Sequence, residues 1–320
     1  LLIVWLPKML INNLTPNRKL VFQIPTPLFS GFDASGTIDY IRHLFEEEKK
    51  REKHLQHNLE SPKEKESYIK FLGPALLISV ILDSEQLNIT LRYYENGKKV
   101  EEAKAVFAIL KRKYLWQEIS YMLRNGRKPE WIVLATPGIV DDESLVTMKK
   151  MNMDHFNLAE EIERRYSARC LVVNNVNACA LGCSHWQPDL KTMTLISFPY
   201  GCTGPGVGTV IDGKILSGRR GLAGECKFYM NRMQFSNSLD KLSRAEEGHY
   251  EMLIATILPL ISFIDPDIIY MRTPLIQDMK ELAARLTNYI AEEYIPKLVY
   301  LNNPLDEVFL GLGILISSRK

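Results

Sequence analysis

The chain has 320 residues, and 46% of them are hydrophobic, which is enough apolar material for two hydrophobic cores. The formal net charge is +2, so the sequence lacks the overall excess of positive charge that is typical of nucleic-acid-binding proteins. The five cysteines are an odd number without a Cys-x-x-Cys pair, which argues against a disulfide scaffold or a zinc ribbon.

The chain opens on a short apolar run, Leu1 to Leu6, that Pro7 interrupts. A run of this length is too short to span a membrane. No cleavage-site pattern follows it, so the sequence does not predict a signal peptide. Together with cysteine usage that suits a reducing compartment, these features predict a cytoplasmic protein without a membrane segment.

From residue 75 onward, apolar patterns of period two and of helical period follow one another, which predicts an α/β protein. Residues 75–95 alternate like a hairpin, and Asn96-Gly97 supplies a turn that returns the chain into 100–106. The other expected strands are 131–135, 171–173, 194–198 and 209–211. The expected helices are 106–124, 158–167, 176–186, 250–264 and 279–298.

Six short motifs carry a resemblance to a known family. The segment 173–182, Val-Asn-Asn-Val-Asn-Ala-Cys-Ala-Leu-Gly, resembles the Asn-Asp-Ala-Asn-Ala-Ala-Ala-Leu-Gly motif of the ROK family of repressors, open reading frames and sugar kinases. Five more segments resemble family motifs in the family's own order: 136–141, 202–208, 221–225, 265–269 and 311–313. Each motif alone is a weak signal, but chance rarely reproduces six of them in sequence.

The resemblance implies a fold and a division of the chain. The expected fold is the two-lobed actin-like, ribonuclease H-like ATPase fold of the α/β class, with an N-terminal extension that resembles a winged helix-turn-helix. The implied parts are a helix-turn-helix-like region and linker (1–70), a first actin-like lobe (71–175), a second actin-like lobe (176–303) and a C-terminal helix that returns to the first lobe (304–320).

The resemblance also implies a sugar site between the lobes. The residues expected to bind the sugar are Gly138, Asn152, Asn174, Asn175 and Glu225. Amides and carboxylates suit this role because each can hydrogen-bond two neighbouring hydroxyl groups. The alternative is that Asn174 and Asn177 only satisfy backbone groups at the end of a strand and at a helix cap.

Several residues depart from the pattern of the family's kinases. Asn175 stands where those kinases have the Asp that acts as general base, and an amide cannot take up the sugar's proton. Asp83 and Glu85 lie in the segment that aligns with the first phosphate loop, where glycines would let backbone N–H groups surround a phosphate. These departures predict a protein that is not an enzyme.

The segment 202–208 resembles the family's second phosphate loop only in part. Its expected remnant consists of Thr203, Gly204 and Gly206, while Pro205 removes one N–H donor. Phe228 stands at the position of a histidine that binds zinc in the family, and the cysteine-rich zinc loop is missing. We therefore expect neither a metal nor a cofactor.

Two segments of the first 70 residues, 17–22 and 33–47, resemble the winged helix-turn-helix of ROK repressors. The resemblance implies DNA contacts by Arg18, Lys19, Thr37 and Arg42. It implies a sugar-responsive transcriptional regulator without kinase activity, which acts as a homodimer or higher homo-oligomer and has operator DNA and a sugar or sugar phosphate as partners. Two alternatives stay open: a ROK sugar kinase that uses ATP, and a sugar-binding relic that does not bind DNA.

Overall fold

The described residues all belong to one compact unit. The computed structural model describes residues 73–83, 86–108 and 111–319 of the chain. The expected helix-turn-helix-like region and linker (1–70) lie outside the described residues. The same is true of the expected DNA contacts Arg18, Lys19, Thr37 and Arg42.

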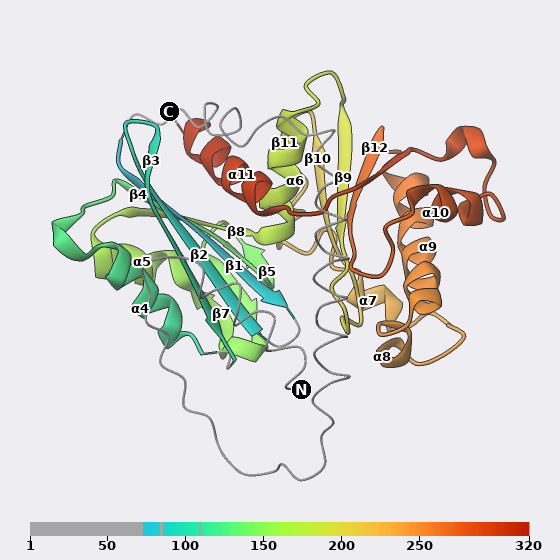
Figure 1. The fold of residues 1–320 in the computed structure, drawn as a ribbon, viewed down its shortest axis with the longest axis horizontal. Coiled ribbons are helices and arrows are strands. Elements are labelled where there is room, and N and C mark those ends of the chain that lie inside the picture. The colour runs from blue at the N-terminus through green and yellow to red at the C-terminus, as the bar shows by residue number, and fades with distance from the viewer. Residues whose placement is uncertain (1–72, 84–85, 109–110, 320) are drawn as a thin grey trace, which may run out of the picture. The chain divides into compact units, whose positions relative to one another are not determined.

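The first lobe contains a five-stranded sheet with the strand order β3-β2-β1-β4-β8 (Figure 1). Its strands are β1 (Ala75–Asp83), β2 (Gln86–Glu95), β3 (Lys98–Phe107), β4 (Trp131–Thr136) and β8 (Arg169–Asn174). The first three strands are antiparallel, whereas β4 runs parallel to both β1 and β8. Asn96 and Gly97 connect β2 to β3 with φ angles of 51° and 72°, as a type I′ turn requires. The predicted hairpin is confirmed.

Helix α4 (Lys113–Met122) is shorter than the sequence pattern predicted. The pattern placed its start near Val106, but Val106 and Phe107 pair with β2 and belong to β3. Val and Phe fit a half-buried strand as well as a helix face, so apolar spacing alone misplaced the boundary. The short helix η1 (Arg124–Gly126) follows, close to the end expected at Asn125-Gly126.

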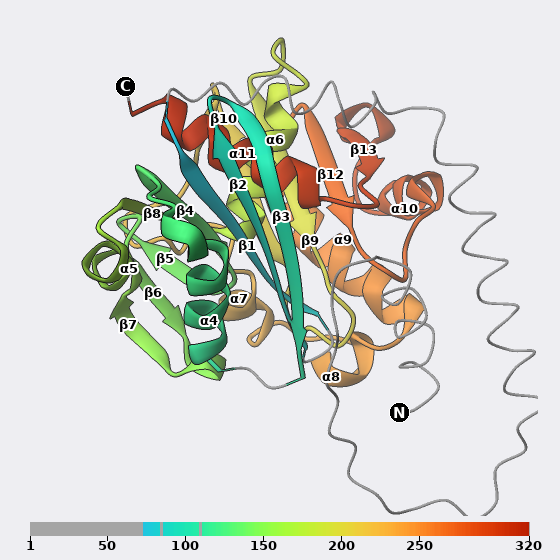
Figure 2. The same ribbon diagram turned by 60° about the vertical axis from the view of Figure 1, so that its left-hand side comes forward.

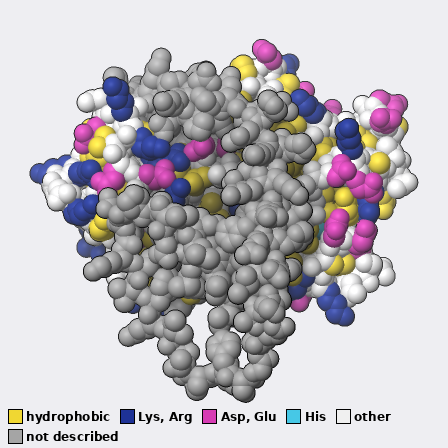
Figure 3. Space-filling view, in the orientation of Figure 1, with side chains coloured by type: hydrophobic (Ala, Val, Ile, Leu, Met, Phe, Trp, Pro, Cys, Tyr) yellow, Lys and Arg dark blue, Asp and Glu magenta, His cyan; other side chains and the backbone are white. Residues whose placement is uncertain are grey.

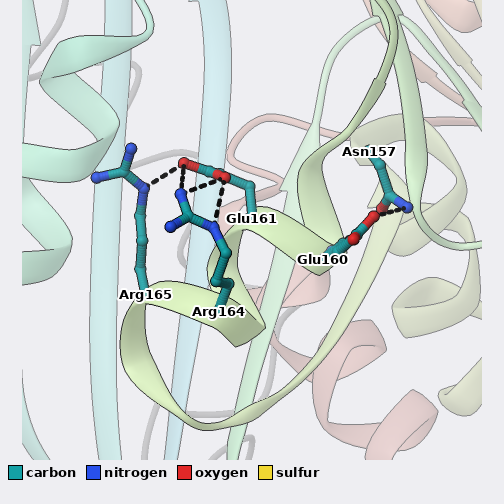
Figure 4. A network of polar contacts seen from close by, with 5 residues as sticks. All are labelled: Asn157, Glu160, Glu161, Arg164 and Arg165. Carbon is teal, nitrogen blue, oxygen red and sulfur yellow. Dashed lines mark hydrogen bonds and ion pairs between the residues drawn. The ribbon is translucent and has the colours of Figure 1, made fainter.

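Helix α5 (Leu158–Tyr166) matches the predicted range 158–167. Asn157 caps its first turn, because the Oδ1 atom of this residue accepts the N–H of Glu160 at 3.1 Å. Glu161 pairs with Arg164 and Arg165 at 2.8 and 2.5 Å, as Figure 4 shows. Oppositely charged residues three and four positions apart give a surface helix modest extra stability.

A three-stranded sheet was not predicted. It consists of β5 (Ile139–Asp141), β6 (Leu145–Met148) and β7 (Met153–Asn157), with the short helix η2 (Lys149–Met151) between the last two strands. Its strands have three to five residues, which is too short for a reliable period-two signal.

The second lobe has another five-stranded sheet, with the strand order β11-β10-β9-β12-β13. Its strands are β9 (Thr192–Ser197), β10 (Gly206–Ile211), β11 (Lys214–Ile215), β12 (Ile268–Arg272) and β13 (Lys297–Tyr300). Its helices are α7 (Lys227–Met230), α8 (Leu239–Leu242), α9 (Glu246–Phe263), α10 (Met279–Leu286) and η3 (Glu292–Tyr294).

The helix expected over 279–298 is wrong in its second half. Helix α10 ends at Leu286, and Leu298 belongs to β13, where it pairs with Ile269 of β12. Pro296 precedes that strand, and a proline cannot lie inside a regular helix without removing a hydrogen bond. The amphipathic pattern therefore continued past the true end of the helix.

Two helices cross between the sheets. Helix α6 (Asn175–His185) is buried from Asn177 to Cys183 and contacts strands of both sheets, and α11 (Leu305–Ser317) lies beside it (Figures 1 and 2). A Cβ atom at Gly182 would overlap the carbonyl oxygen of Glu307, and one at Gly311 would overlap that of Ala178. The proposed lobe boundaries at residues 175 and 303 fall at the beginning of these two helices, and the division remains a proposal.

The described surface carries charges of both signs. On the face shown in Figure 3, Lys and Arg side chains lie among Asp and Glu side chains rather than in one large patch. Among the helices of the described residues, none is both long enough and apolar enough to cross a membrane.

The close crossing of α6 and α11 gives a test of the fold. We expect Gly311→Ala to lower the free energy of unfolding by about 1–3 kcal/mol, because the added methyl group meets the backbone of α6. Urea unfolding monitored by circular dichroism measures the effect. Ser317→Ala, an exposed substitution on the same helix, is the control and should change stability by less than about 0.5 kcal/mol. Equal stability of the two variants would contradict the close packing.

Candidate functional site

The candidate site lies where β8 ends and α6 begins. Asn174 caps α6, because its Oδ1 atom accepts the N–H groups of Val176 and Asn177 at 2.8 and 3.3 Å. Its Nδ2 atom donates to the carbonyl oxygen of Gly138 at 2.7 Å. The capping alternative therefore describes what Asn174 does in this structure. A contact between its remaining N–H and a sugar stays a prediction.

Asn175 is the first residue of α6 and is half-buried. Its Nδ2 atom lies 3.4 Å from the carbonyl oxygen of Val80, near the end of β1. The amide thus lies beside the last part of β1. The side chain can donate and accept hydrogen bonds here, but it cannot act as a base.

Glycines of the second lobe pack directly on the first turn of α6. The Cβ position at Gly206 lies 3.2 Å from Cγ2 of Val176, and the Cβ position at Gly208 lies 2.7 Å from the Val176 carbonyl oxygen. Larger residues would push β10 away from the helix. Gly206 also forms a β-bridge with Glu225. These contacts join Gly138, Asn174, Gly206 and Glu225 into one continuous group.

The segment 216–225 reaches both lobes and places Glu225. Gly221 has a φ of 65°, and a Cβ atom there would overlap the carbonyl oxygen of Val140 in β5. Arg220 pairs with Asp141 of the same strand at 3.2 Å. Near the other end of the segment, the carbonyl oxygen of Gly224 accepts the N–H of Val207 at 3.0 Å. The sequence motif located Gly221 and Gly224, but nothing in it indicated that β5 is their neighbour.

Other expected site residues lie at the margins of this group. Asn152 is exposed in the turn between η2 and β7, in a left-handed conformation with a φ of 54°. The contacts that join the four central residues do not include it. Thr203 is exposed, and Phe228 is 57% exposed next to the Glu225–Lys227 ion pair, whose charged atoms are 3.0 Å apart. Their roles remain predictions.

The remnant phosphate loop rests on a buried polar cluster that the sequence did not reveal. The N–H of Gly201 donates to the Ser243 carbonyl oxygen at 2.8 Å, and the same oxygen accepts Nε2–H of His249 at 2.9 Å. Nδ1 of His249 accepts the hydroxyl of Thr273 at 3.0 Å, and the ring stacks on Phe198 with a centroid distance of 4.1 Å. Because a carbonyl only accepts, the contact with Ser243 requires a proton on Nε2, and in the neutral ring Nδ1 then accepts the Thr273 hydroxyl.

Two titratable groups near the loop are held in their neutral forms. Burial lowers the pKa of His249, although the hydrogen bond to Ser243 acts in the opposite direction. Burial raises the pKa of the Cys226 thiol to about 11, so this thiol stays protonated at neutral pH. A metal binds the thiolate, which makes Cys226 a poor ligand. Within the described residues, no group of three or more His, Cys, Asp or Glu residues could hold a metal ion.

The lowered pKa of His249 predicts a pH dependence of stability. Below its ordinary pKa of 6.5 the unfolded chain takes up a proton before the folded chain does, so the free energy of unfolding falls as the pH falls. We expect lower stability at pH 5.5 than at pH 7.5 in urea unfolding. In His249→Phe this pH dependence should shrink, with a general loss of about 1–3 kcal/mol from the broken hydrogen bonds. An unchanged pH dependence in the variant would contradict the assignment.

A model of the ROK family matches residues 96–232 of the chain. Over this segment the chain is similar to the ROK family. N-acetylmannosamine kinases of Salmonella arizonae and Salmonella newport are 34% identical to this chain over 97 residues, which are 29% of the chain. The match covers 32% of each relative, so the chain spans about a third of the length of the curated relatives it matches.

Solved structures share the fold of this chain. A ROK glucokinase of Streptomyces griseus in complex with glucose and AMPPNP is 16% identical, with a TM-score of 0.56 over 76% of this chain and 99% of its own. A ROK transcriptional regulator, a homologue of the E. coli Mlc protein, is 19% identical, with a TM-score of 0.54 over 76% of this chain and 80% of its own. The described part of the chain thus has the two-lobed actin-like fold that the motifs implied.

The relatives correct one expectation. We expected a protein that is not an enzyme, because Asn175 replaces the catalytic Asp and the first phosphate loop has lost its glycines. The curated relatives are named as kinases, and so is the Streptomyces structure with its nucleotide analogue. The expectation relied on a few substituted positions within the motifs. It gave too little weight to the motif residues around them that still match.

Proposed function

We propose that the chain is a ROK-type sugar kinase that transfers a phosphoryl group from ATP to an N-acetylated amino sugar or a related hexose. The main support is the continuous group formed by Gly138, Asn174, Gly206 and Glu225 at the first turn of α6. The proposed class of sugar comes from the segment that is 34% identical to N-acetylmannosamine kinases.

Phosphoryl transfer can tolerate the amide at position 175. The transition state is loose, so most of the catalysis comes from positioning the reactants and from stabilising charge. Asn175 can accept the hydrogen bond of a sugar hydroxyl and hold it, and Glu225 can bind neighbouring hydroxyls. Without a base the hydroxyl keeps its proton until late in the reaction. We therefore infer a slow kinase.

Restoring the carboxylate at position 175 tests this mechanism. We expect Asn175→Asp to raise kcat at neutral pH by a factor of about 10²–10⁴, the usual contribution of a general base. The KM for the sugar should change much less, since Asp and Asn have similar shapes. A coupled assay with MgATP and N-acetylmannosamine, glucose or other hexoses measures ADP release, and mass spectrometry identifies the sugar phosphate.

Asn288→Asp is the matched control, because Asn288 is exposed in the turn after α10. Its kinetics should equal those of the unaltered protein. If neither the unaltered protein nor Asn175→Asp forms a sugar phosphate with any sugar of the panel, the kinase proposal is wrong.

A second candidate is a sugar-responsive transcriptional regulator that binds DNA as a homodimer or higher oligomer. The observations that favour it are the fold shared with the ROK regulator and the two segments, 17–22 and 33–47, that resemble a winged helix-turn-helix. Both candidates use the same sugar site. They differ in whether residues 1–70 bind DNA.

Binding to genomic DNA fragments separates the two candidates. If the chain is a regulator, it should select a specific fragment with an affinity that falls as salt rises. Arg42→Ala should relax the sequence preference, whereas Lys19→Ala should weaken binding to all sequences and reduce the salt slope by about one. Lys214→Ala, at an exposed lysine of β11, is the control. Absence of salt-dependent DNA binding, with and without sugars, removes the regulator candidate.

A further inference from the structure

We propose that Lys227 and Arg244 form a clamp of two cations around the loop 201–206, and that this clamp holds the terminal phosphates of the phosphoryl donor. The inference rests on the proposed kinase function. It assigns to these two side chains a task that the segment aligned with the first phosphate loop, with Asp83 and Ser84 in place of glycines, is poorly suited to perform.

Lys227 flanks the middle of the loop. The position of a Cβ atom at Gly204 lies 3.0 Å from both Cα and Cβ of Lys227, so the two backbones are in direct contact. Nζ of Lys227 lies 3.0 Å from Oε2 of Glu225, and the side chain is 48% exposed. The ammonium group therefore lies next to the carboxylate expected to bind the sugar and beside the phosphate loop.

Arg244 flanks the start of the loop. Its Nη1 atom lies 3.3 Å from the Cβ position at Gly201, which has a φ of 71°, so the guanidinium group packs against a bare backbone. The N–H of Gly201 is fixed by Ser243, the residue before Arg244, and buried His249 fixes Ser243 in turn. The backbone next to Arg244 is thus fixed to the loop, and its guanidinium group lies against Gly201 with a side chain that is 52% exposed.

Between the two cations the loop presents free donors. In the described residues, the N–H groups of Thr203 and Gly204 donate to no protein acceptor. Unsatisfied consecutive N–H groups at a partly exposed turn suit an anion with several oxygen atoms. Pro205 then ends the run of donors, which limits the contact to a small group such as a phosphate.

The carboxylates that now pair with the cations do not prevent this role. Nη2 of Arg244 lies 3.2 Å from Oδ1 of Asp240, and Lys227 pairs with Glu225, but both ion pairs reach solvent. Exposed ion pairs are weak. A polyphosphate carries several charges and accepts hydrogen bonds from Arg and Lys in favourable geometry, so it can displace them.

Binding of inorganic tripolyphosphate to the full chain, measured by isothermal titration calorimetry, tests the clamp without the adenosine or the sugar. We expect Lys227→Gln and Arg244→Gln each to weaken binding about tenfold, which corresponds to about 1.4 kcal/mol. Lys227→Arg keeps the positive charge and one ion contact. Its dissociation constant for tripolyphosphate should therefore lie within about threefold of that of the unaltered protein. Lys241→Gln, exposed on α8 one turn before Arg244, removes the same charge away from the loop and should have no effect.

The outcomes separate the clamp from the kinase proposal. If tripolyphosphate binding follows this pattern while no sugar is phosphorylated, the clamp is supported and the kinase proposal fails. If sugar is phosphorylated but both Gln variants bind tripolyphosphate like the unaltered protein, the clamp is wrong. It is also wrong if the unaltered protein does not bind tripolyphosphate. Thermal unfolding of each variant verifies that it is folded.

Discussion

The close crossing of α6 and α11 is the constraint on which the site depends. Gly182 and Gly311 let the two backbones touch, and α6 in turn contacts strands of both sheets. The buried Arg92 side chain adds two ion pairs between elements, one with Glu102 on β3 and one with Asp306 on α11. A buried cation needs such partners, since isolation from water is costly. The position of the first turn of α6, and with it Asn174 and Asn175, follows from this packing.

The site is built mainly from backbone contacts. Gly206 and Gly208 bring β10 against α6, and Gly221 brings the segment 216–225 against β5. At Gly208 and Gly221 a carbonyl oxygen lies too close for a Cβ atom, and at Gly206 the Val176 side chain leaves little room for one.

The elements with strong local signals could be predicted from the sequence, and those fixed by distant partners could not. The hairpin around Asn96-Gly97 and the helix α5 carry their turn and cap residues with them. By contrast, Val106 and Leu298 were assigned to helices, because only pairing with β2 and β12 makes them strand residues. For the same reason the motifs located Asn174 and Glu225 but not the support by Ser243 and His249, which comes from a separate part of the chain.

The size of each catalytic effect decides how one substitution should be weighed. A general base contributes a factor of about 10²–10⁴, whereas enzymes typically accelerate reactions by about 10⁶–10¹⁷. In the proposed kinase, the absence of a base at position 175 therefore leaves most of the possible acceleration to positioning and charge. Those terms depend on the frame around α6 and on cations near the phosphates, which Lys227 and Arg244 can supply. The residue at position 175 therefore affects how fast the proposed reaction runs, but it does not determine which reaction takes place.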